Sequence, residues 1–365
     1  MVLNDFHCHF YTHDSGAAMD RIITWASSKN IKQMNSTPSI QEAPYSCELE
    51  KQMTCCKDSE EQGSPAQNIS VGMILNNIRE KSLWENGTLF SLSRNKEYFN
   101  VIPFIGIHPW DTAEADEETI NSLKEISSRT GAFIGEFGFD KLKGADKEKQ
   151  LYLFKKCLEI ALKSEKPFTI HCVRSWGLLE EELQKVKNRI KAPFIVHAYN
   201  GSAEVMKTIT QLGGYPSFGL ERYGAFSRKA ADSILKIDLK YLLFETDFTC
   251  YLKQPTSSFR SDDDGENSIN VAHAYPVMPS KDCENREHPV MPANDRENSK
   301  HHVIPTKAGI SLSHTEDNYY GEKYLKRLFA VYNEAASILK IDITELSGAI
   351  EENGKIFKAY TINRK

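Results

Sequence analysis

Short apolar runs alternate along the chain with longer stretches in which apolar residues recur every three or four positions. A short apolar run bounded by turn residues is typical of a buried strand, and the wider spacing is typical of an amphipathic helix. Eight runs are predicted as strands: Val2–His7, Ile31–Met34, Val101–Ile107, Ala132–Glu136, Pro167–His171, Pro193–His197, Tyr215–Phe218 and Tyr241–Glu245. Helices are predicted at Lys147–Lys163, Ser202–Leu212, Ser227–Leu235, Glu322–Leu339 and Ile343–Tyr360. This alternation predicts an α/β protein.

The order of these elements favours a closed (β/α)8 TIM barrel over an open doubly wound sheet. A doubly wound sheet that binds nucleotides has a glycine-rich phosphate loop after its first strand, and no such loop follows Val2–His7. Once two polar stretches at 42–72 and 253–318 are set aside, the remaining length is close to the ~250 residues of one barrel. We therefore expect residues 1–365 to form a single barrel domain with two polar insertions.

The second polar stretch contains a short repeat. Residues Pro276–Asn285 recur thirteen positions later as Pro289–Asn298, and a shorter copy, His302–Pro305, follows at the same offset. Repeats that stack into solenoids are usually at least about 20 residues long. We interpret this one as an expanded low-complexity loop that is dispensable for folding, with a partner-binding arm as the alternative.

Composition and charge exclude several classes of protein. The chain has 45 Lys and Arg against 50 Asp and Glu, a net charge of −5, which argues against coating nucleic acid through bulk charge but leaves a local basic site open. Its 8 cysteines show no CxxC spacing, so neither a zinc ribbon nor a disulfide framework is predicted, and we expect a reducing cytoplasm. No stretch approaches the ~20 apolar residues of a membrane span. The first residues lack the basic start and long apolar core of a signal peptide.

Residues with metal-binding chemistry stand where the predicted strands end. Side chains alternate faces along a strand, so His7 and His9 share one face, and we expect Cys8 to point to the other. A lone histidine or acid at a strand end is usually a hydrogen-bonded core residue or a helix cap. The strands of a barrel, however, all end on one rim, where the active site is built. Six side chains are predicted to converge there as metal ligands: His7, His9, Glu136, His171, His197 and Asp247.

This donor set suggests a particular chemistry. Imidazoles and carboxylates without thiolates suit Zn²⁺, Mn²⁺ or Mg²⁺. Six ligands exceed what one tetrahedral catalytic zinc takes, so we expect two divalent metals, with Glu136 between them and placed to stabilise a displacement at phosphorus. Asp247 is the candidate catalytic base, because a carboxylate that is ionised at neutral pH can accept a proton from the attacking water. Glu136 and Asp247 are therefore the predicted catalytic residues.

With these residues in this order, the chain resembles the TatD family of metal-dependent deoxyribonucleases, in the amidohydrolase superfamily. The resemblance rests on motifs that occur in the family's order from Asp5 to Phe357: Asp5–His9, Gly106–Pro109, Gly135–Asp140, Ile170–Cys172, His197–Ser202, Glu245–Asp247 and Asn353–Phe357. It implies the same six ligands and a metal requirement for Mg²⁺, Mn²⁺ or Zn²⁺. It also implies that His108 faces the substrate phosphate and that the enzyme acts on DNA ends as a nuclease.

The chain departs from the family pattern at two places. The arginine that commonly stands two residues after the fourth histidine stands here at three, as Arg174; it is our candidate for a second phosphate contact, with a plain salt bridge as the alternative. After Asp247 the usual small residue and proline are replaced by Phe248-Thr249-Cys250, and the long polar stretch follows. That stretch leaves the predicted catalytic rim, so it bears on substrate access.

Two other functions remain open from the sequence. The same metal centre could hydrolyse an amide or ester, including the ester bond of a charged tRNA. The chain could instead be a metal-binding scaffold whose polar arm recruits a partner, although an intact ligand set favours an enzyme. No obligate protein partner and no membrane association are predicted.

Overall fold

The computed structural model describes residues 1–12, 69–79, 81–84, 101–221, 224–252 and 314–362, to which the following account is confined. These residues belong to one compact unit formed by Met1–Gln254 and Leu312–Lys365. Most of the two stretches predicted as polar insertions, and the predicted strand at Ile31–Met34, lie outside the described residues. The 13-residue repeat also lies outside them.

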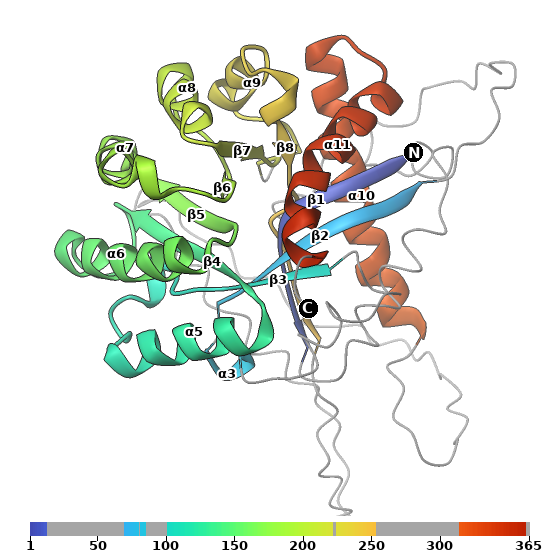
Figure 1. The fold of residues 1–365 in the computed structure, drawn as a ribbon. Helices are drawn as coiled ribbons and strands as arrows, with labels where there is room; N and C mark the ends of the chain where they lie inside the picture. The colour runs from blue at the N-terminus through green and yellow to red at the C-terminus, as the bar shows by residue number, and fades with distance from the viewer. Residues whose placement is uncertain (13–68, 80, 85–100, 222–223, 253–313, 363–365) are drawn as a thin grey trace, which may run out of the picture. The chain divides into compact units, whose positions relative to one another are not determined.

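A single parallel sheet forms the centre of the compact unit (Figure 1). Its strands run in the order β8-β7-β6-β5-β4-β3-β2-β1-β9, and each pairing is parallel. The strands are β1 (Val2–Thr12), β2 (Ser70–Ile78), β3 (Val101–Ile105), β4 (Phe133–Asp140), β5 (Phe168–Val173), β6 (Phe194–Val196), β7 (Gly214–Phe218), β8 (Leu243–Phe244) and β9 (Phe248–Leu252). Every residue of β3, β4, β6 and β7 is buried, which explains why these strands appear in the sequence as nearly continuous apolar runs.

The sheet closes through the short segment that joins β8 to β9. β8 pairs with β7, and β9, which begins four residues after β8 ends, pairs with β1 at the other end of the strand order. Between them, the backbone N–H of Asp247 donates to the carbonyl of His7 at 3.0 Å. β8 and β9 together therefore act as the eighth strand, and the fold is the TIM-barrel-like α/β fold that the sequence predicts.

Helices follow the strands and cover the outside of the sheet (Figure 1). They are α3 (Lys81–Trp84), α5 (Glu117–Thr130), α6 (Lys147–Ser164), α7 (Trp176–Lys185), α8 (Ala203–Gln211), α9 (Arg228–Ile234), α10 (His314–Leu339) and α11 (Ile343–Ile362), with short 3₁₀ turns η2 (Pro109–Asp111), η3 (Lys187–Arg189) and η4 (Leu239–Tyr241). The N-caps that immediately precede α5, α6, α8 and α9 are Asp116, Asp146, Ser202 and Ser227, and each of their side chains accepts a backbone N–H of the first turn. None of the helices within the described ranges combines the length and the hydropathy needed to cross a lipid bilayer.

Several elements differ from those predicted; β1 and β4, for example, continue to Thr12 and Asp140, beyond their predicted ends at His7 and Glu136. β2 begins at Ser70, whereas the first polar stretch was predicted to continue to Gly72. α10 begins at His314, inside the range predicted as the second insertion. β9 was not predicted as a separate strand. In β2 the signal is present as the buried apolar run Met73-Ile74-Leu75, but the preceding polar residues obscure where the strand starts.

Candidate metal centre

The carboxyl ends of five strands position the six predicted ligands. His7 and His9 lie on β1, Glu136 on β4, His171 on β5, His197 directly after β6, and Asp247 between β8 and β9. The residue opposite His171 on β4 is Gly138, whose φ is +156°. A Cβ atom there would lie 1.9 Å from the carbonyl oxygen of His171, so only glycine allows the two strands to approach so closely beside the ligands.

The four ligand imidazoles surround the carboxylate of Glu136. The nearest is His197, whose Nε2 is 2.9 Å from Oε2 of Glu136. The corresponding separations are 3.4 Å for His9 Nε2, 3.5 Å for His171 Nδ1 and 3.6 Å for His7 Nε2. The Glu136 side chain is only 2% exposed, so the cluster is a buried, polar centre.

Asp247 lies on the solvent side of this cluster. One of its carboxylate oxygens is 3.4 Å from His9 Nε2 and 3.8 Å from His7 Nε2, while 48% of its side chain is exposed. Three groups of side chains within the described ranges bring their donor atoms close enough to hold a metal ion: His7, Glu136 and His197; His7, His9 and Asp247; and His108, Glu136 and His171. The six predicted ligands thus lie together, and His108 is a seventh member of the cluster.

Asn77, at the end of β2, orients the two histidines of β1. Its backbone carbonyl accepts a hydrogen bond from Nδ1 of His9 at 2.7 Å, which fixes the proton of His9 on Nδ1 and leaves Nε2 facing Glu136 and Asp247. The side-chain amide of Asn77 lies 2.9 Å from Nδ1 of His7. The atom that faces His7 is the amide nitrogen Nδ2, which donates, so Nδ1 of His7 accepts this hydrogen bond.

Carboxylates orient the other two histidines. Oδ2 of Asp140 is 3.5 Å from Nε2 of His171, and Oε1 of Glu245 is 3.4 Å from Nδ1 of His197. His9, His171 and His197 therefore each direct one nitrogen to the Glu136 centre and the other to an acceptor, whereas the outer nitrogen of His7 faces the Asn77 amide. Carboxylate or carbonyl partners of this kind set the tautomer and orientation of metal-ligating histidines.

The electrostatics of the cluster favour ionised carboxylates. Burial by itself would raise the pKa of Glu136, but His108, His197 and His7 around it hold that pKa well below its usual value. The crowded surroundings of Asp247 likewise oppose its ionisation, but the neighbouring imidazoles of His9 and His7 keep its pKa low. Burial lowers the pKa of His7, so His7 is neutral.

His108 joins the cluster from the turn after β3. Its Nε2 is 3.7 Å from Oε2 of Glu136, and its Nδ1 accepts the backbone N–H of Trp110 at 3.1 Å. Burial lowers the pKa of His108, so the ring is neutral. Because Nδ1 accepts a hydrogen bond, the proton lies on Nε2, which makes His108 a hydrogen-bond donor toward the centre.

A buried network supports the backbone of His7 and Asp247. Oδ1 of Asp5 accepts the backbone N–H groups of His7 at 3.2 Å and Thr246 at 3.0 Å, and its Oδ2 accepts the Thr246 hydroxyl at 2.7 Å. From α10, Arg327 donates to the carbonyl of Thr246 at 2.6 Å and to that of Leu220 at 3.2 Å. These contacts fix the strand ends that carry the first histidine pair and Asp247.

Sequence reasoning did not assign a role to these supporting residues. Asp5, Asp140 and Glu245 stand inside the motifs that carry the ligands, and Asn77 ends an apolar run just as the ligands do. The same rule, a polar residue at a strand end, could have found Asn77 if β2 had been predicted. Arg327 lies far along the sequence in a helix, and no local pattern indicates its contact.

The donor set fits a divalent cation. Oε2 of Glu136 is a buried carboxylate oxygen to which no described donor makes a well-aligned hydrogen bond, although Nε2 of His197 lies 2.9 Å away. A buried anionic oxygen without a well-aligned partner is costly, and a cation held between it and the imidazoles would supply one. The ligand groups within the described ranges contain no cysteine, in agreement with a centre made of nitrogen and oxygen donors.

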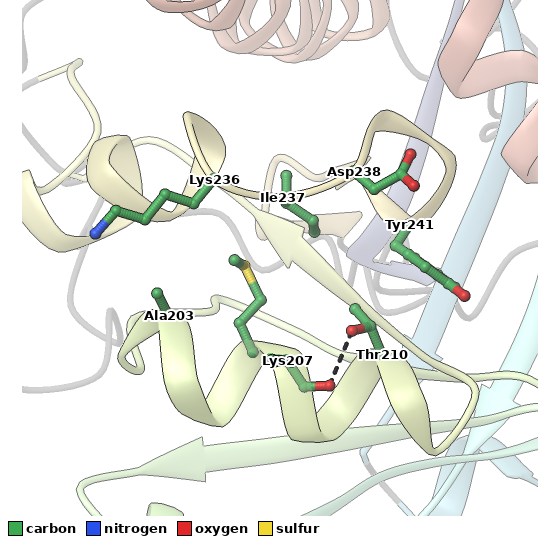
Figure 2. Close-up of a pocket in the computed structure, with 8 residues that line it drawn as sticks. Ala203, Lys207, Thr210, Lys236, Ile237, Asp238 and Tyr241 are labelled. Carbon is green, nitrogen blue, oxygen red and sulfur yellow. Dashed lines mark hydrogen bonds between the residues drawn. The ribbon is translucent and has the colours of Figure 1, made fainter.

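Two other features lie apart from this centre. Arg174 is exposed after β5, with φ of +52°, and among the described residues it has no ion pair or hydrogen bond to the cluster. A cavity of about 230 Å³ lies between α8 and the segment from the end of α9 to η4, lined by Lys207, Thr210 and Tyr241 among others (Figure 2). The residues that line it include no ligand, so it is separate from the candidate metal centre.

Comparison with known proteins identifies the family. The sequence pattern described as TatD-related DNase matches residues 4–261, which include all six predicted ligands. The chain belongs to the TatD-related DNase family. Two curated relatives, both named as uncharacterized metal-dependent hydrolases, are similar to it. One, from Methanocaldococcus jannaschii, is 29% identical over 164 residues, 44% of this chain and 62% of the relative. The other, from Bacillus subtilis, is 29% identical over 159 residues, 42% of this chain and 60% of the relative.

Solved structures agree with the TatD fold. A TatD homolog from Escherichia coli k12 superposes with a TM-score of 0.56 at 16% identity, covering 97% of each chain. A TatD family hydrolase from Entamoeba histolytica gives 0.57 at 15% identity, covering 98% of this chain and 99% of the other. The sequence matches to the curated relatives span about 60% of those relatives' length.

Proposed function

We propose that this TatD-family protein is a metal-dependent hydrolase that cleaves phosphodiester bonds and releases nucleotides from DNA ends. Family membership supports this proposal, as do the names of the curated relatives. The observation that carries it is the arrangement around Glu136, where each of four imidazoles directs one nitrogen inward while a neighbouring group faces the other. An oriented set of this kind is what a catalytic cation site requires.

We infer that the cluster holds two divalent ions, Mg²⁺, Mn²⁺ or Zn²⁺. His7, His9 and Asp247 form one group of donors, and Nδ1 of His171 and Nε2 of His197 approach Oε2 of Glu136 at 3.5 and 2.9 Å to form the other side of the cluster. Glu136 approaches histidines of both groups and is the residue we place between the ions. Divalent ions bound there would polarise the phosphate, increase the acidity of water and offset the negative charge of the transition state.

Asp247 is the proposed general base. It is ionised and half exposed, so water can approach its carboxylate from the solvent side while His9 and His7 hold it from the other. In the reaction, Asp247 accepts a proton from the water that attacks phosphorus, a new P–O bond forms, and the bond to the leaving nucleotide oxygen breaks.

His108 and Arg174 are the proposed phosphate contacts. His108 is neutral with its proton on Nε2, so it donates a hydrogen bond to a non-bridging phosphate oxygen. Arg174, exposed at the end of β5, would add charge from the solvent side. The proposed substrate is nucleic acid alone, without a protein partner, and we place the reaction in the cytoplasm.

The proposal is tested by restoring metal to chelated protein. Mg²⁺, Mn²⁺ and Zn²⁺ are added separately, and hydrolysis of labelled single-stranded DNA, bis(p-nitrophenyl) phosphate and p-nitrophenyl acetate is measured. We expect metal-dependent cleavage of the two phosphodiesters and shortening of the DNA from an end. If only the acetate ester were hydrolysed in a metal-dependent way, the proposal of phosphodiester cleavage would be wrong, and the protein would be assigned as a carboxylic ester hydrolase.

A further inference from the structure

An exposed tryptophan stands at the edge of the candidate metal centre. Trp110 follows His108 and Pro109 in η2, and 41% of its surface is exposed, whereas His108 is 3% exposed. The two ring centroids are 5.0 Å apart and the planes are nearly perpendicular, at 87°. The indole therefore lies at the boundary between the buried cluster and solvent.

The indole is held in a fixed orientation. Its Nε1 donates to Oδ2 of Asp140 at 2.6 Å, and the backbone N–H of Trp110 donates to His108. Asp140 is also the residue that faces His171. A large aromatic ring that stays in solvent although its polar atom is anchored in the site forms a rigid, amphipathic surface for binding.

Two cations accompany this ring. Nζ of Lys143 is 4.0 Å from the ring centroid and Cζ of Arg79 is 5.1 Å from it. Arg79 is fixed by a two-pronged ion pair with Asp111, at 2.8 and 3.1 Å. Lys143 is exposed on the loop after β4, so its ammonium group can leave the ring for a stronger anionic partner. Trp110, Arg79 and Lys143 follow the carboxyl ends of β3, β2 and β4, on the same rim as the ligands.

An exposed aromatic ring beside cations suits a ligand that carries flat apolar rings and phosphates in alternation. Single-stranded nucleic acid has this chemistry, and proteins bind it by stacking bases on aromatic side chains while cations follow the backbone. We propose that Trp110 is the stacking surface for a nucleobase next to the scissile phosphate, with Lys143 and Arg79 receiving a neighbouring phosphate. This inference rests on the proposed function and specifies a single strand as the substrate.

Binding is measured first, without any need for catalysis. The full chain, with chelator present, is titrated against a fluorescein-labelled oligothymidylate and followed by fluorescence anisotropy. Loss of base stacking costs about 1–3 kcal/mol, or roughly five- to a hundredfold in Kd, which is the weakening expected for Trp110→Leu. Trp110→Phe keeps an aromatic face and should bind within a few-fold of the wild type. Lys143→Glu should weaken binding most at low salt, because it removes a phosphate contact.

A second exposed aromatic supplies the matched control. Tyr152 on α6 is also 41% exposed and has Lys156 at 5.1 Å from its ring, but its hydroxyl contacts Glu117 rather than the candidate metal centre. Tyr152→Leu should bind the oligonucleotide like the wild type. Unchanged binding by Trp110→Leu, or equal weakening by Tyr152→Leu, would overturn the proposal. Thermal unfolding of each variant verifies that it is folded.

Measurement of hydrolysis then distinguishes base stacking on Trp110 from a role of Trp110 in positioning His171 through Asp140. The ratio of kcat/KM for the p-nitrophenyl ester of thymidylate to that for methyl p-nitrophenyl phosphate, which has no second aromatic ring, isolates the contribution of the base. We expect Trp110→Leu to lower this ratio and Asp140→Asn, which affects His171, to reduce both rates together. An unchanged ratio in Trp110→Leu would assign Trp110 to positioning through Asp140 and contradict stacking. If the wild type hydrolyses neither substrate, the proposed function fails, while the binding measurement still decides the role of Trp110.

Discussion

Asp247 differs from the other candidate ligands in its access to solvent. Its side chain is 48% exposed, whereas that of Glu136 is 2% exposed. The φ of Asp247 is +47°, and the backbone turns there between β8 and β9. Among the residues of the cluster it therefore has the position expected of a base that meets water.

Replacing Asp247 by Asn tests that assignment. Asn keeps the shape and one coordinating oxygen but cannot accept the proton, and general-base assistance typically contributes 10²–10⁴-fold. We expect Asp247→Asn to lose at least about a hundredfold in kcat while it still binds metal. His7→Ala should lose metal and activity together and recover in part at high metal concentration. An Asp247→Asn enzyme with near-normal rates would move the base elsewhere.

The cysteines beside the ligands are expected to be structural. Cys8 is fully buried and its thiol contacts the carbonyl of Leu75 at 3.5 Å, and Cys172 is 3% exposed. Burial raises the pKa of both thiols, that of Cys172 to about 12, so neither is a ready thiolate ligand. Cys8→Ala and Cys172→Ala should each cost about 1 kcal/mol of stability and retain their metal content. Loss of metal from either variant, measured by elemental analysis, would refute this view.

At the scale of elements, the strand ends explain why the ligands were predictable. His7, Glu136 and His171 each close an apolar run, and the parallel barrel brings the ends of such runs together whatever their separation in sequence. Asn77 was missed because β2 was not predicted. Arg327 was missed for another reason: its partners, Thr246 and Leu220, are reached only through tertiary packing, which no helical periodicity encodes.

Helix α10 is expected to hold residues 246–247, the segment that carries Asp247, in place through Arg327. Arg327 satisfies two backbone carbonyls there, and losing a partner of a buried polar group costs about 1–3 kcal/mol. Arg327→Met keeps the aliphatic stem, so we expect a lower Tm and a kcat reduced by about tenfold through displacement of Asp247. Lys326→Met, next to it in the same helix, removes only an ion pair with Glu322 and serves as the control. Equal rates in both variants would show that α10 does not position the segment.

At the scale of the whole molecule, residues 1–254 and 312–365 form a compact unit with its own core. The segment between them contains the repeat, whose composition offers little apolar surface to bury. Replacing 256–311 by a short linker should therefore leave one cooperative thermal transition with a Tm within a few degrees of the wild type. Aggregation or loss of the transition, seen by circular dichroism, would show that folding depends on this segment.

Metal binding at the Glu136 cluster is the central claim, and one titration tests it most directly. Mn²⁺ is added to the chelated full chain and to Glu136→Gln, and bound Mn²⁺ is measured by electron paramagnetic resonance while hydrolysis of bis(p-nitrophenyl) phosphate is followed in the same samples. We predict that binding and rate rise together in the wild type and that both are strongly reduced in Glu136→Gln, because the amide removes the negative charge that the four imidazoles surround. A Glu136→Gln protein that binds Mn²⁺ and hydrolyses the substrate like the wild type would contradict the account.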